Sequence, residues 1–319
     1  MAAANWPVAL VQSGADALAK LLAATPLIGG AILSSIVIGA DLTSLRTGDW
    51  AALVSEVVGT LLQHGPVLVT FLLSATLMIV GASLFVFLVK GGTMGTIVRG
   101  ERQAGPVEVP PLQPAVLATA GAFSIELFVD AARSLFPRYA RLGLSLMAVY
   151  LGSGVGFVAT VLAGPPVGEG WGYTSVVTVA FVLWITLVNL LYLLMQVVIA
   201  ADDCGIGVAA RRVALFLRHG ARSIAAVFVV MLGTVVLATG ASLTAITLLG
   251  FVALVPLVGV VAMPLQLLAF LLRAVVLQYI DLLAVGAYVK LYREFALALA
   301  ADRRQVAPAW APPADLPQA

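Results

Sequence analysis

Residues 67–90 are VLVTFLLSATLMIVGASLFVFLVK, and Lys90 is the only charged residue among them. A helix needs roughly 20 predominantly apolar residues to cross about 30 Å of hydrocarbon. With 24 residues this stretch is long enough to cross the hydrocarbon, and nearly all of its side chains are uncharged and apolar. It therefore predicts a transmembrane helix, and five further stretches of the chain are built in the same way.

The composition of the whole chain agrees with a membrane protein. Of its 319 residues, 62% are hydrophobic and only 10% are charged, and the mean hydropathy is +1.10. About a quarter of the residues in a soluble domain are charged, so a water-soluble fold of this size would lack polar side chains to cover its surface. The lipid bilayer is the natural solvent for this chain. The net charge of +2 gives no indication of a nucleic-acid partner.

The apolar stretches predict an all-α, polytopic membrane helical bundle of about six transmembrane helices. The predicted spans are residues 25–40, 67–90, 142–163, 173–201, 224–249 and 264–288. Pro256 and Gly259 interrupt the apolar segment 250–263, which predicts a turn near the outer interface. Residues 1–305 are expected to form a single transmembrane domain, and the Pro-rich residues 306–319 a flexible cytoplasmic tail.

Shorter amphipathic helices are predicted next to the spans. In the N-terminal segment Gln12, Asp16 and Lys20 recur every four residues and lie opposite an apolar face. Residues 123–136 and 206–219 repeat this pattern, and a further helix over 49–63 is expected on the other side of the membrane. Such helices are short for a span and suit the headgroup boundary.

The distribution of basic residues predicts the orientation. The N-terminal segment, the second-to-third and fourth-to-fifth connections and the C-terminal segment hold fifteen Lys and Arg residues, whereas the opposite loops hold only Arg46. Lys and Arg are in excess on the cytoplasmic side of a membrane. The abundance of Arg over Lys, with Ala, Val, Leu and Gly dominant, is typical of a GC-rich bacterial genome. We therefore expect a multi-pass protein of the bacterial cytoplasmic (inner) membrane with both termini in the cytoplasm.

A faint internal repeat divides the chain. Ala131–Arg133 and Leu135–Arg138 precede the third span, and Ala209–Arg211 and Leu215–Arg218 precede the fifth, about 80 residues later. Each unit would contain an interfacial helix, a span, an outer turn and a second span, which gives three helix-pair units. Chance similarity in a chain rich in Ala, Leu and Arg is the alternative, and the sequence does not decide between the two.

Arg273 is the most unusual residue, because it lies within the sixth predicted span. A charge in this position costs at least about 2.5 kcal/mol unless it is paired or reaches water. Polar side chains of the fourth and sixth spans lie at comparable depths and predict a polar seam between these helices. One interpretation is a substrate or ion path. In the other, which we favour, Arg273 extends to the interface while the amides hydrogen-bond from helix to helix. The seam residues are Asn189, Tyr192, Gln196, Gln266, Arg273, Gln278 and Asp281.

The sequence contains no motif for catalysis or metal binding. His64 and His219 are predicted on opposite sides of the membrane, and the single cysteine, Cys204, excludes an internal disulfide and a Cys-based metal site. Gly91–Gly95 lacks the Gly-Lys-Ser/Thr ending of a phosphate-binding loop, so a helix contact through small residues explains it better. We therefore expect no metal site, no cofactor and no enzymatic activity.

Basic side chains cluster at the predicted cytoplasmic face. They would attract anionic phospholipid headgroups, each contributing about 1 kcal/mol, and they also fix the topology. Asp202 and Asp203 end the fourth span, and we expect one to cap the next helix and the other to pair with Arg211 or Arg212. The predicted lipid contacts are Arg133, Arg138, Arg141, Arg211, Arg212, Arg218 and Arg222.

Three short stretches carry a resemblance to a known family. They are Gly91-Gly92 leading to Arg99-Gly100-Glu101, Ala200–Asp203 continuing through Ala209–Arg212, and Leu291–Glu294. They resemble a broad family of bacterial six-span membrane proteins, which includes the membrane domain found beside some glycerophosphoryl diester phosphodiesterases and the YciC-like inner-membrane proteins. The resemblance implies a six-span layout with cytoplasmic amphipathic helices. It carries over no catalytic residues, and no soluble phosphodiesterase domain is present in these 319 residues, so that activity is not implied.

These features predict a non-catalytic integral membrane protein that acts as a scaffold, an envelope factor or a subunit of a larger complex. Its expected partners are the bilayer, anionic headgroups and another membrane protein. The alternative is a small-molecule or lipid transporter that uses the seam between the fourth and sixth spans.

Overall fold

The computed structural model describes residues 5–38, 59, 62–104, 123–165, 171–253 and 258–306. Within these ranges the chain is all-helical and contains no strand. Six helices are long and apolar enough to cross a membrane, which confirms the predicted polytopic bundle. The helices are α1 (Trp6–Ile38), α4 (Gly65–Ala104), α6 (Ile125–Leu162), α7 (Trp171–Asp202), α8 (Ile206–Ala253) and α9 (Val258–Val306).

The amphipathic segments are continuous with the spans that follow them. Residues 125–136 are the first part of α6, which continues through Pro137, and residues 206–219 are the first part of α8. Ser124 begins α6, because its Oγ accepts a hydrogen bond of 3.1 Å from the Leu127 N–H. Glu126 in the first turn adds a favourable charge at the positive end of the helix dipole. No such cap lies between the amphipathic segment and the span, since α6 continues through Pro137 although this residue has no N–H to donate to the preceding turn.

Two predicted segments lie outside the described residues. These are most of the amphipathic helix expected over 49–63 and the Pro-rich tail after Val306. The predicted turn over 250–263 is shortened from both sides, because α8 extends to Ala253 and α9 begins at Val258.

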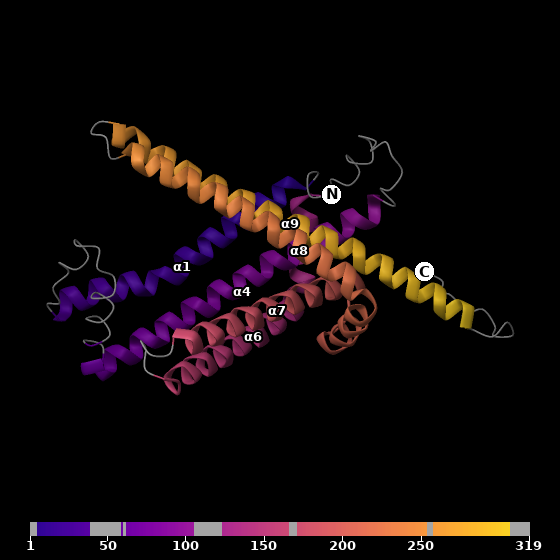
Figure 1. Cartoon of the computed structure of the whole chain (residues 1–319), viewed down its shortest axis with the longest axis horizontal. Coiled ribbons are helices and arrows are strands. Elements are labelled where there is room, and N and C mark those ends of the chain that lie inside the picture. Colours follow the sequence, from indigo (N-terminus) through magenta and orange to yellow (C-terminus); the bar gives the residue numbers. More distant parts are fainter. Residues whose placement is uncertain are drawn as a thin grey trace.

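Consecutive helices pack side by side. α1 lies against α4, α6 against α7, and α8 runs beside α9 along most of its length, while α4 also packs closely on α6 (Figure 1). The pair α8 and α9 crosses the layer of α4, α6 and α7 at an angle, so the helices meet near one region and diverge from it. The contact of α4 with α6, which belong to different predicted units, is at least as extensive as the contacts within the pairs, so the grouping into three helix-pair units stays a prediction.

Glycines bring α4 and α6 into close contact. A Cβ atom added to Gly92 would lie 2.6 Å from the ring of Phe128, and one added to Gly95 would lie 2.4 Å from the Cβ of Ala131. Several residues farther along the same pair of helices, a Cβ on Gly143 of α6 would lie 2.2 Å from the Phe87 ring. Small residues let helix backbones approach in this way. The Gly91–Gly95 stretch is thus part of a helix contact.

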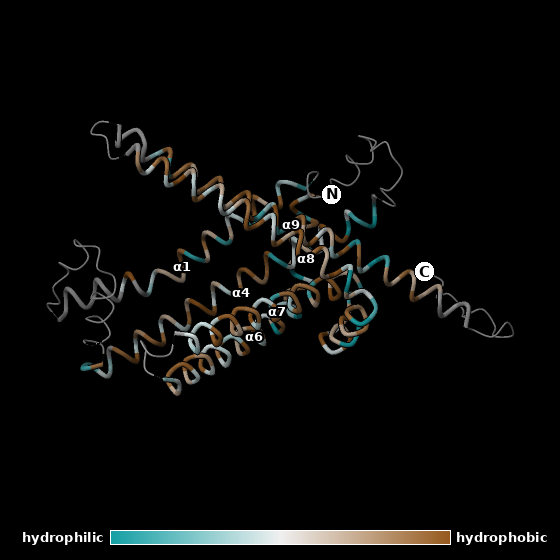
Figure 2. Tube along the Cα trace, in the orientation of Figure 1, coloured by the Kyte–Doolittle hydropathy of each residue, from teal (hydrophilic) through white to brown (hydrophobic). Residues whose placement is uncertain are grey.

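The buried core lies where the helices cross, and it draws on all six. Away from that region the large apolar side chains are exposed, for example Leu77 at 73% and Leu162 at 80%. Figure 2 shows hydrophobic colour along most of the diverging helices and hydrophilic segments at the start of α8. The exposed apolar surface suits a lipid environment. One core residue from each helix is Val8, Phe87, Tyr139, Leu194, Phe216 and Tyr288.

Candidate functional site

Polar side chains from several helices meet at the connection between α7 and α8. Asp202 is the last residue of α7, and Asp203 follows with a positive φ of 47°. Asp is one of the few residues that tolerate this left-handed conformation, which ends the helix. The Asp202 carboxylate accepts hydrogen bonds from Arg212 of α8 and from the Tyr292 hydroxyl of α9. The Asp203 carboxylate pairs with Arg138 of α6.

The α4 helix joins this cluster near its C-terminal end. Arg102 donates a hydrogen bond to the carbonyl of Ala201 in α7. Arg293 of α9 donates to the backbone carbonyl of Glu101 at 2.9 Å, and its guanidinium lies 3.7 Å from the Glu101 carboxylate. Glu101 is only 9% exposed, so it needs this partner more than a surface carboxylate would. We call the following set the junction network: Glu101, Arg102, Arg138, Ala201, Asp202, Asp203, Arg212, Tyr292 and Arg293.

Only part of the pairing in the junction network could be predicted from the sequence. The pairing of Asp202 with Arg212 was expected, because both residues lie close in sequence. The expectation that the other aspartate would cap α8 is replaced by its pairing with Arg138 in α6. The residues that meet here include members of all three stretches that carry the family resemblance, from α4, from the α7–α8 connection and from α9.

Cys204 lies beside the junction network. Its Sγ is 3.9 Å from the carbonyl of Val198, the acceptor of a weak S–H hydrogen bond. Burial raises the pKa of this thiol, and the Asp202 carboxylate raises it further, against the opposing effect of the Arg212 guanidinium. The thiol is therefore held in its protonated, poorly nucleophilic form.

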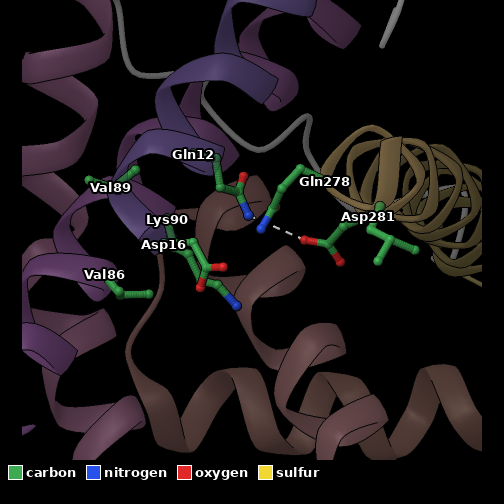
Figure 3. A pocket seen from close by; sticks show the side chains of 9 residues that line it. Gln12, Asp16, Val86, Val89, Lys90, Gln278 and Asp281 are labelled. Atoms are coloured by element: carbon green, nitrogen blue, oxygen red, sulfur yellow. Dashed lines mark hydrogen bonds between the residues drawn. The ribbon is translucent and has the colours of Figure 1, made fainter. Parts of the chain in front are cut away.

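A separate cavity of about 220 Å3, lined by polar and apolar side chains, lies between α1, α4 and α9. Figure 3 shows the side chains of Gln12, Gln278 and Asp281 directed toward one another in this cavity. Gln12 Nε2 donates to Asp281 Oδ2 at 3.3 Å, which links the first helix to the last described one. Asp16 and Lys90 also line the cavity.

Two amide oxygens of this cavity have no hydrogen-bond partner among the described residues. They are Oε1 of Gln12 and Oε1 of Gln278, and both atoms are buried. Gln12 as a whole is only 7% exposed. An unpaired buried acceptor is costly, but Thr93, Tyr192 and Gln196, outside this cavity, each have a comparable atom, so these two oxygens do not by themselves indicate a ligand.

The predicted seam residues of α7 contact α6 and α4. The Asn189 side-chain oxygen accepts a hydrogen bond from Tyr150 of α6, and the Gln196 carbonyl accepts one of 2.8 Å from the Tyr139 hydroxyl. The ammonium of Lys90 lies 5.8 Å from the centre of the Tyr192 ring, a cation–π geometry. Lys90 thereby connects Tyr192 to the cavity between α1, α4 and α9.

The predicted seam residues of α9 face three different helices, α1, α4 and α8. Gln278 and Asp281 line the cavity with α1 and α4. Gln266 lies beside Gly250 of α8, where its Nε2 would be 3.8 Å from an added Cβ. Arg273 is half-buried and makes no hydrogen bond or ion pair with any described residue. A single seam that joins all seven residues as a functional path stays a prediction.

The basic residues predicted to contact lipid fall into two groups. Arg138 and Arg212 belong to the junction network and pair with Asp203 and Asp202. The remaining five are exposed: Arg133, Arg141, Arg211, Arg218 and Arg222.

A wider cavity of about 510 Å3 lies between α4, α6 and the end of α7. Arg99 and Arg102 line it together with Asp130 and Asp203. Because the two charge signs balance, this cavity has no evident preference for an anion or a cation.

The described residues contain no group of three His, Cys, Asp or Glu side chains that could hold a metal ion. Comparisons of the chain with models of protein families, with curated proteins and with solved structures found no match.

Proposed function

We propose that this protein is a non-catalytic component of the bacterial cytoplasmic membrane that acts as a scaffold, an envelope factor or a subunit of a larger complex. The observation that supports this most is the junction network. Its charged side chains pair with one another across five helices, as with Asp202, Arg212 and Tyr292. Groups that are held in such pairs stabilise an assembly of helices and are poorly placed to react with a substrate.

The exposed apolar surface supports a role in a complex. Large side chains on α6 and α7 point outward along both helices, among them Leu151 at 73% and Val176 at 69% exposure. In the membrane, helices associate through close packing of such surfaces and through small residues. Gly152, Gly154 and Gly156 on α6 have open space beside them, so another helix can approach there.

Co-purification in a mild detergent tests the subunit role. We expect a second membrane protein at a fixed stoichiometry, measured by the intact mass of the complex. Gly152→Leu places a bulky side chain on the open face of α6 and should release that partner. Gly233→Leu on α8, which also has open space beside it, is the matched control. A monomer alone in every mild detergent would argue against a subunit.

The orientation with both termini in the cytoplasm is part of this proposal. The excess of Lys and Arg at the ends that carry the junction network supports it. Reporter fusions after residues 104 and 319 are expected to show cytoplasmic activity, whereas a fusion at residue 46 should show activity on the outer side. The reverse pattern would exclude the proposed topology.

We also propose that the chain belongs to the bacterial six-span family that its sequence resembles. The contacts between the three resembling stretches support this, because residues that depend on one another structurally tend to be kept together. Members of that family should then place a carboxylate, an Arg and a Tyr at the positions of Asp202, Arg212 and Tyr292. An alignment of such sequences in which these positions vary independently would contradict the assignment.

A transporter is the second candidate. The observation that favours it is Arg273, half-buried in α9 and without a hydrogen bond or ion pair to the described part of the chain. Arg273→Leu should leave membrane insertion intact. If this variant also leaves flux of a candidate substrate into proteoliposomes unchanged, the seam is not a transport path.

A further inference from the structure

The outer parts of α8 and α9 pack on each other and leave their remaining sides open. We call residues 240–251 of α8 and 264–274 of α9 the outer hairpin. From Pro264 to Ala274 only Gln266, Ala269 and Arg273 are half-buried, and the other residues are exposed. Residues 240–250 of α8 are likewise half-buried along one face only. In Figure 1 this pair of helices extends away from α4, α6 and α7. Within the described part of the chain, each helix of the outer hairpin is therefore covered by the other alone.

Arg273 lies on the face of α9 that α8 covers. Gln266, on the same face, lies beside Gly250, where its Nε2 would be 3.8 Å from an added Cβ. Because the two helices are antiparallel, Arg273 lies two turns farther along, at the level of Leu243 in α8. α8 contains no Asp or Glu, so the helix beside Arg273 cannot neutralise its charge. Arg273 also forms no hydrogen bond or ion pair with any described residue.

The charge of Arg273 lies deep in the membrane-spanning part of α9. Asp16, Lys90 and Asp281, from three helices, line one cavity and mark the level at which the bundle leaves the hydrocarbon. Arg273 precedes Asp281 by eight residues, about 12 Å along the helix. Helical side chains lean toward the N-terminus of their helix, which for Arg273 is away from this level. In about 30 Å of hydrocarbon, the guanidinium of Arg273 is thus near the middle.

The neighbouring surface of α8 allows another helix to approach closely. Near the level of Arg273, α8 exposes the small side chains of Ala241, Thr244 and Ala245. Gly240 has no neighbouring heavy atom within 4 Å of an added Cβ. Small residues of this kind let helix backbones come together within a membrane. The outer hairpin thus combines an open contact surface with a charge that needs a counter-ion.

The counter-ion of Arg273 is best supplied by another protein. A second copy of this chain offers none at this depth, because its apolar spans contain no Asp or Glu. A lipid phosphate lies at the headgroup level, about 12 Å or more along the helix from Arg273. A carboxylate on the helix of another membrane protein can lie at the required depth, and it matches the guanidinium in both charge and hydrogen-bonding geometry. The spans without an acid are residues 21–38, 65–89, 142–162, 172–201, 224–253 and 258–280.

We propose that the outer hairpin binds a transmembrane helix of another protein that carries an Asp or Glu near the middle of its span. The carboxylate accepts hydrogen bonds from the Arg273 guanidinium, and the partner helix packs on the small residues around Gly240. This inference rests on the proposed role as a subunit of a larger complex, and it names the chemistry of the partner. The outer hairpin is a separate surface from the open face of α6. Arg273 then serves assembly rather than transport.

Synthetic transmembrane peptides of Leu and Ala test the proposal on the unaltered protein. One peptide has an Asp at its centre, and the matched peptides have Asn or Leu there, or the Asp near one end. The protein, labelled at its C-terminus, and a labelled peptide are reconstituted in phosphatidylcholine vesicles, and binding is measured by energy transfer. We expect the peptide with the central Asp to bind roughly tenfold more tightly than the one with Leu, with the other two in between. Equal binding of the Asp and Leu peptides would overturn the proposal.

Substitutions of Arg273 locate the preference. Arg273→Leu should bind the peptides with central Asp and central Leu equally, and Arg273→Glu should prefer a peptide with a central Lys. Arg222→Leu removes an exposed charge from α8 far from the outer hairpin and is the matched control, expected to keep the preference for Asp. A preference for Asp that survives Arg273→Leu would place the site elsewhere.

Two further results separate the alternatives. Phosphatidylglycerol added to the vesicles should leave the preference for Asp in place, whereas loss of the preference would assign Arg273 to a lipid phosphate. If a partner co-purifies at fixed stoichiometry with Arg273→Leu and the Asp peptide does not bind the unaltered protein, the subunit role stands and the outer-hairpin site is wrong. If the Asp peptide binds through Arg273 and no partner co-purifies, the site stands and the subunit role fails.

Discussion

The hydroxyl of Tyr292 in α9 donates a hydrogen bond to the carboxylate of Asp202, the last residue of α7. The two residues are 90 positions apart in the chain, and Tyr292 is only 3% exposed. Arg212 donates to the same carboxylate oxygen from α8. One carboxylate thus connects three helices.

Tyr292→Phe removes one donor from Asp202 and keeps the aromatic packing. Because hydrogen bonds to charged groups contribute about 1.5–3 kcal/mol, we expect a loss of this size in the free energy of unfolding, measured by denaturation in mixed micelles. Tyr279→Phe, on the same helix and without such a bond in the described residues, should change stability little. Equal effects of the two substitutions would contradict the proposed importance of the hydroxyl.

Exchanging the charges of Arg138 and Asp203 tests the contact between α6 and the α7–α8 connection. Asp203 is largely exposed, with 78% of its side chain accessible, so loss of the ion pair should cost no more than about 1 kcal/mol. Asp203→Arg should cost about 1–2 kcal/mol more, because Arg tolerates the positive φ of this position less well than Asp. Arg138→Asp combined with Asp203→Arg should recover part of the energy of the ion pair. A double variant that is as unstable as the sum of the single ones would show that the two residues do not interact.

Gly95→Ala tests the close contact of α4 with α6. The added methyl group would lie 2.4 Å from the Cβ of Ala131, which has no rotamer to move. Overpacking of this kind costs about 1–3 kcal/mol, and we expect a matching drop in thermal stability in detergent. Gly152→Ala in α6 has open space beside it and should be close to neutral. Stability unchanged in Gly95→Ala would mean that the helices are farther apart than described.

The reactivity of Cys204 tests the environment of the junction network. Burial raises the pKa of its thiol, so alkylation by iodoacetamide should begin at a higher pH in the folded protein than in the protein unfolded in denaturant. Between the two pKa values the folded chain holds a proton that the unfolded chain has released, and stability therefore falls as pH rises through this window. Asp202→Asn should lower the pKa toward its usual value. Identical alkylation profiles of folded and unfolded protein would exclude a perturbed thiol.

The helices themselves could be predicted from the sequence because apolar length is a strong signal. Residues 67–90 lie entirely within α4, and the described residues contain six such helices. The exact ends were harder to predict. Interfacial and membrane-spanning residues are both helical, so the change from one environment to the other does not end the helix at Pro137 of α6 or at Gly220 of α8.

The partners of the polar residues could not be predicted to the same extent. Asp202 and Arg212 are close in sequence, so their pairing was expected. Asn189 and Gln278 were assigned to a common seam because they have similar depths, yet Asn189 contacts Tyr150 of α6 and Gln278 faces α1 and α4. In a membrane, the apolar faces of helices resemble lipid and each other, so they give little information about which helix lies beside which. The regular spacing of Gln12 and Asp16 indicated a polar face but not the helix that it meets.

The position of Tyr292 and Arg293 late in the chain has a consequence for biosynthesis. Glu101 and Asp202 emerge from the ribosome long before these two residues, and α9 later supplies an ion pair to the Glu101 carboxylate and a second donor to the Asp202 carboxylate. A chain interrupted before residue 292 therefore leaves Glu101, near the end of α4, without its cationic partner, whereas Asp202 at the end of α7 keeps Arg212. A truncated chain thus differs from the complete one in an unpaired negative charge near the end of α4.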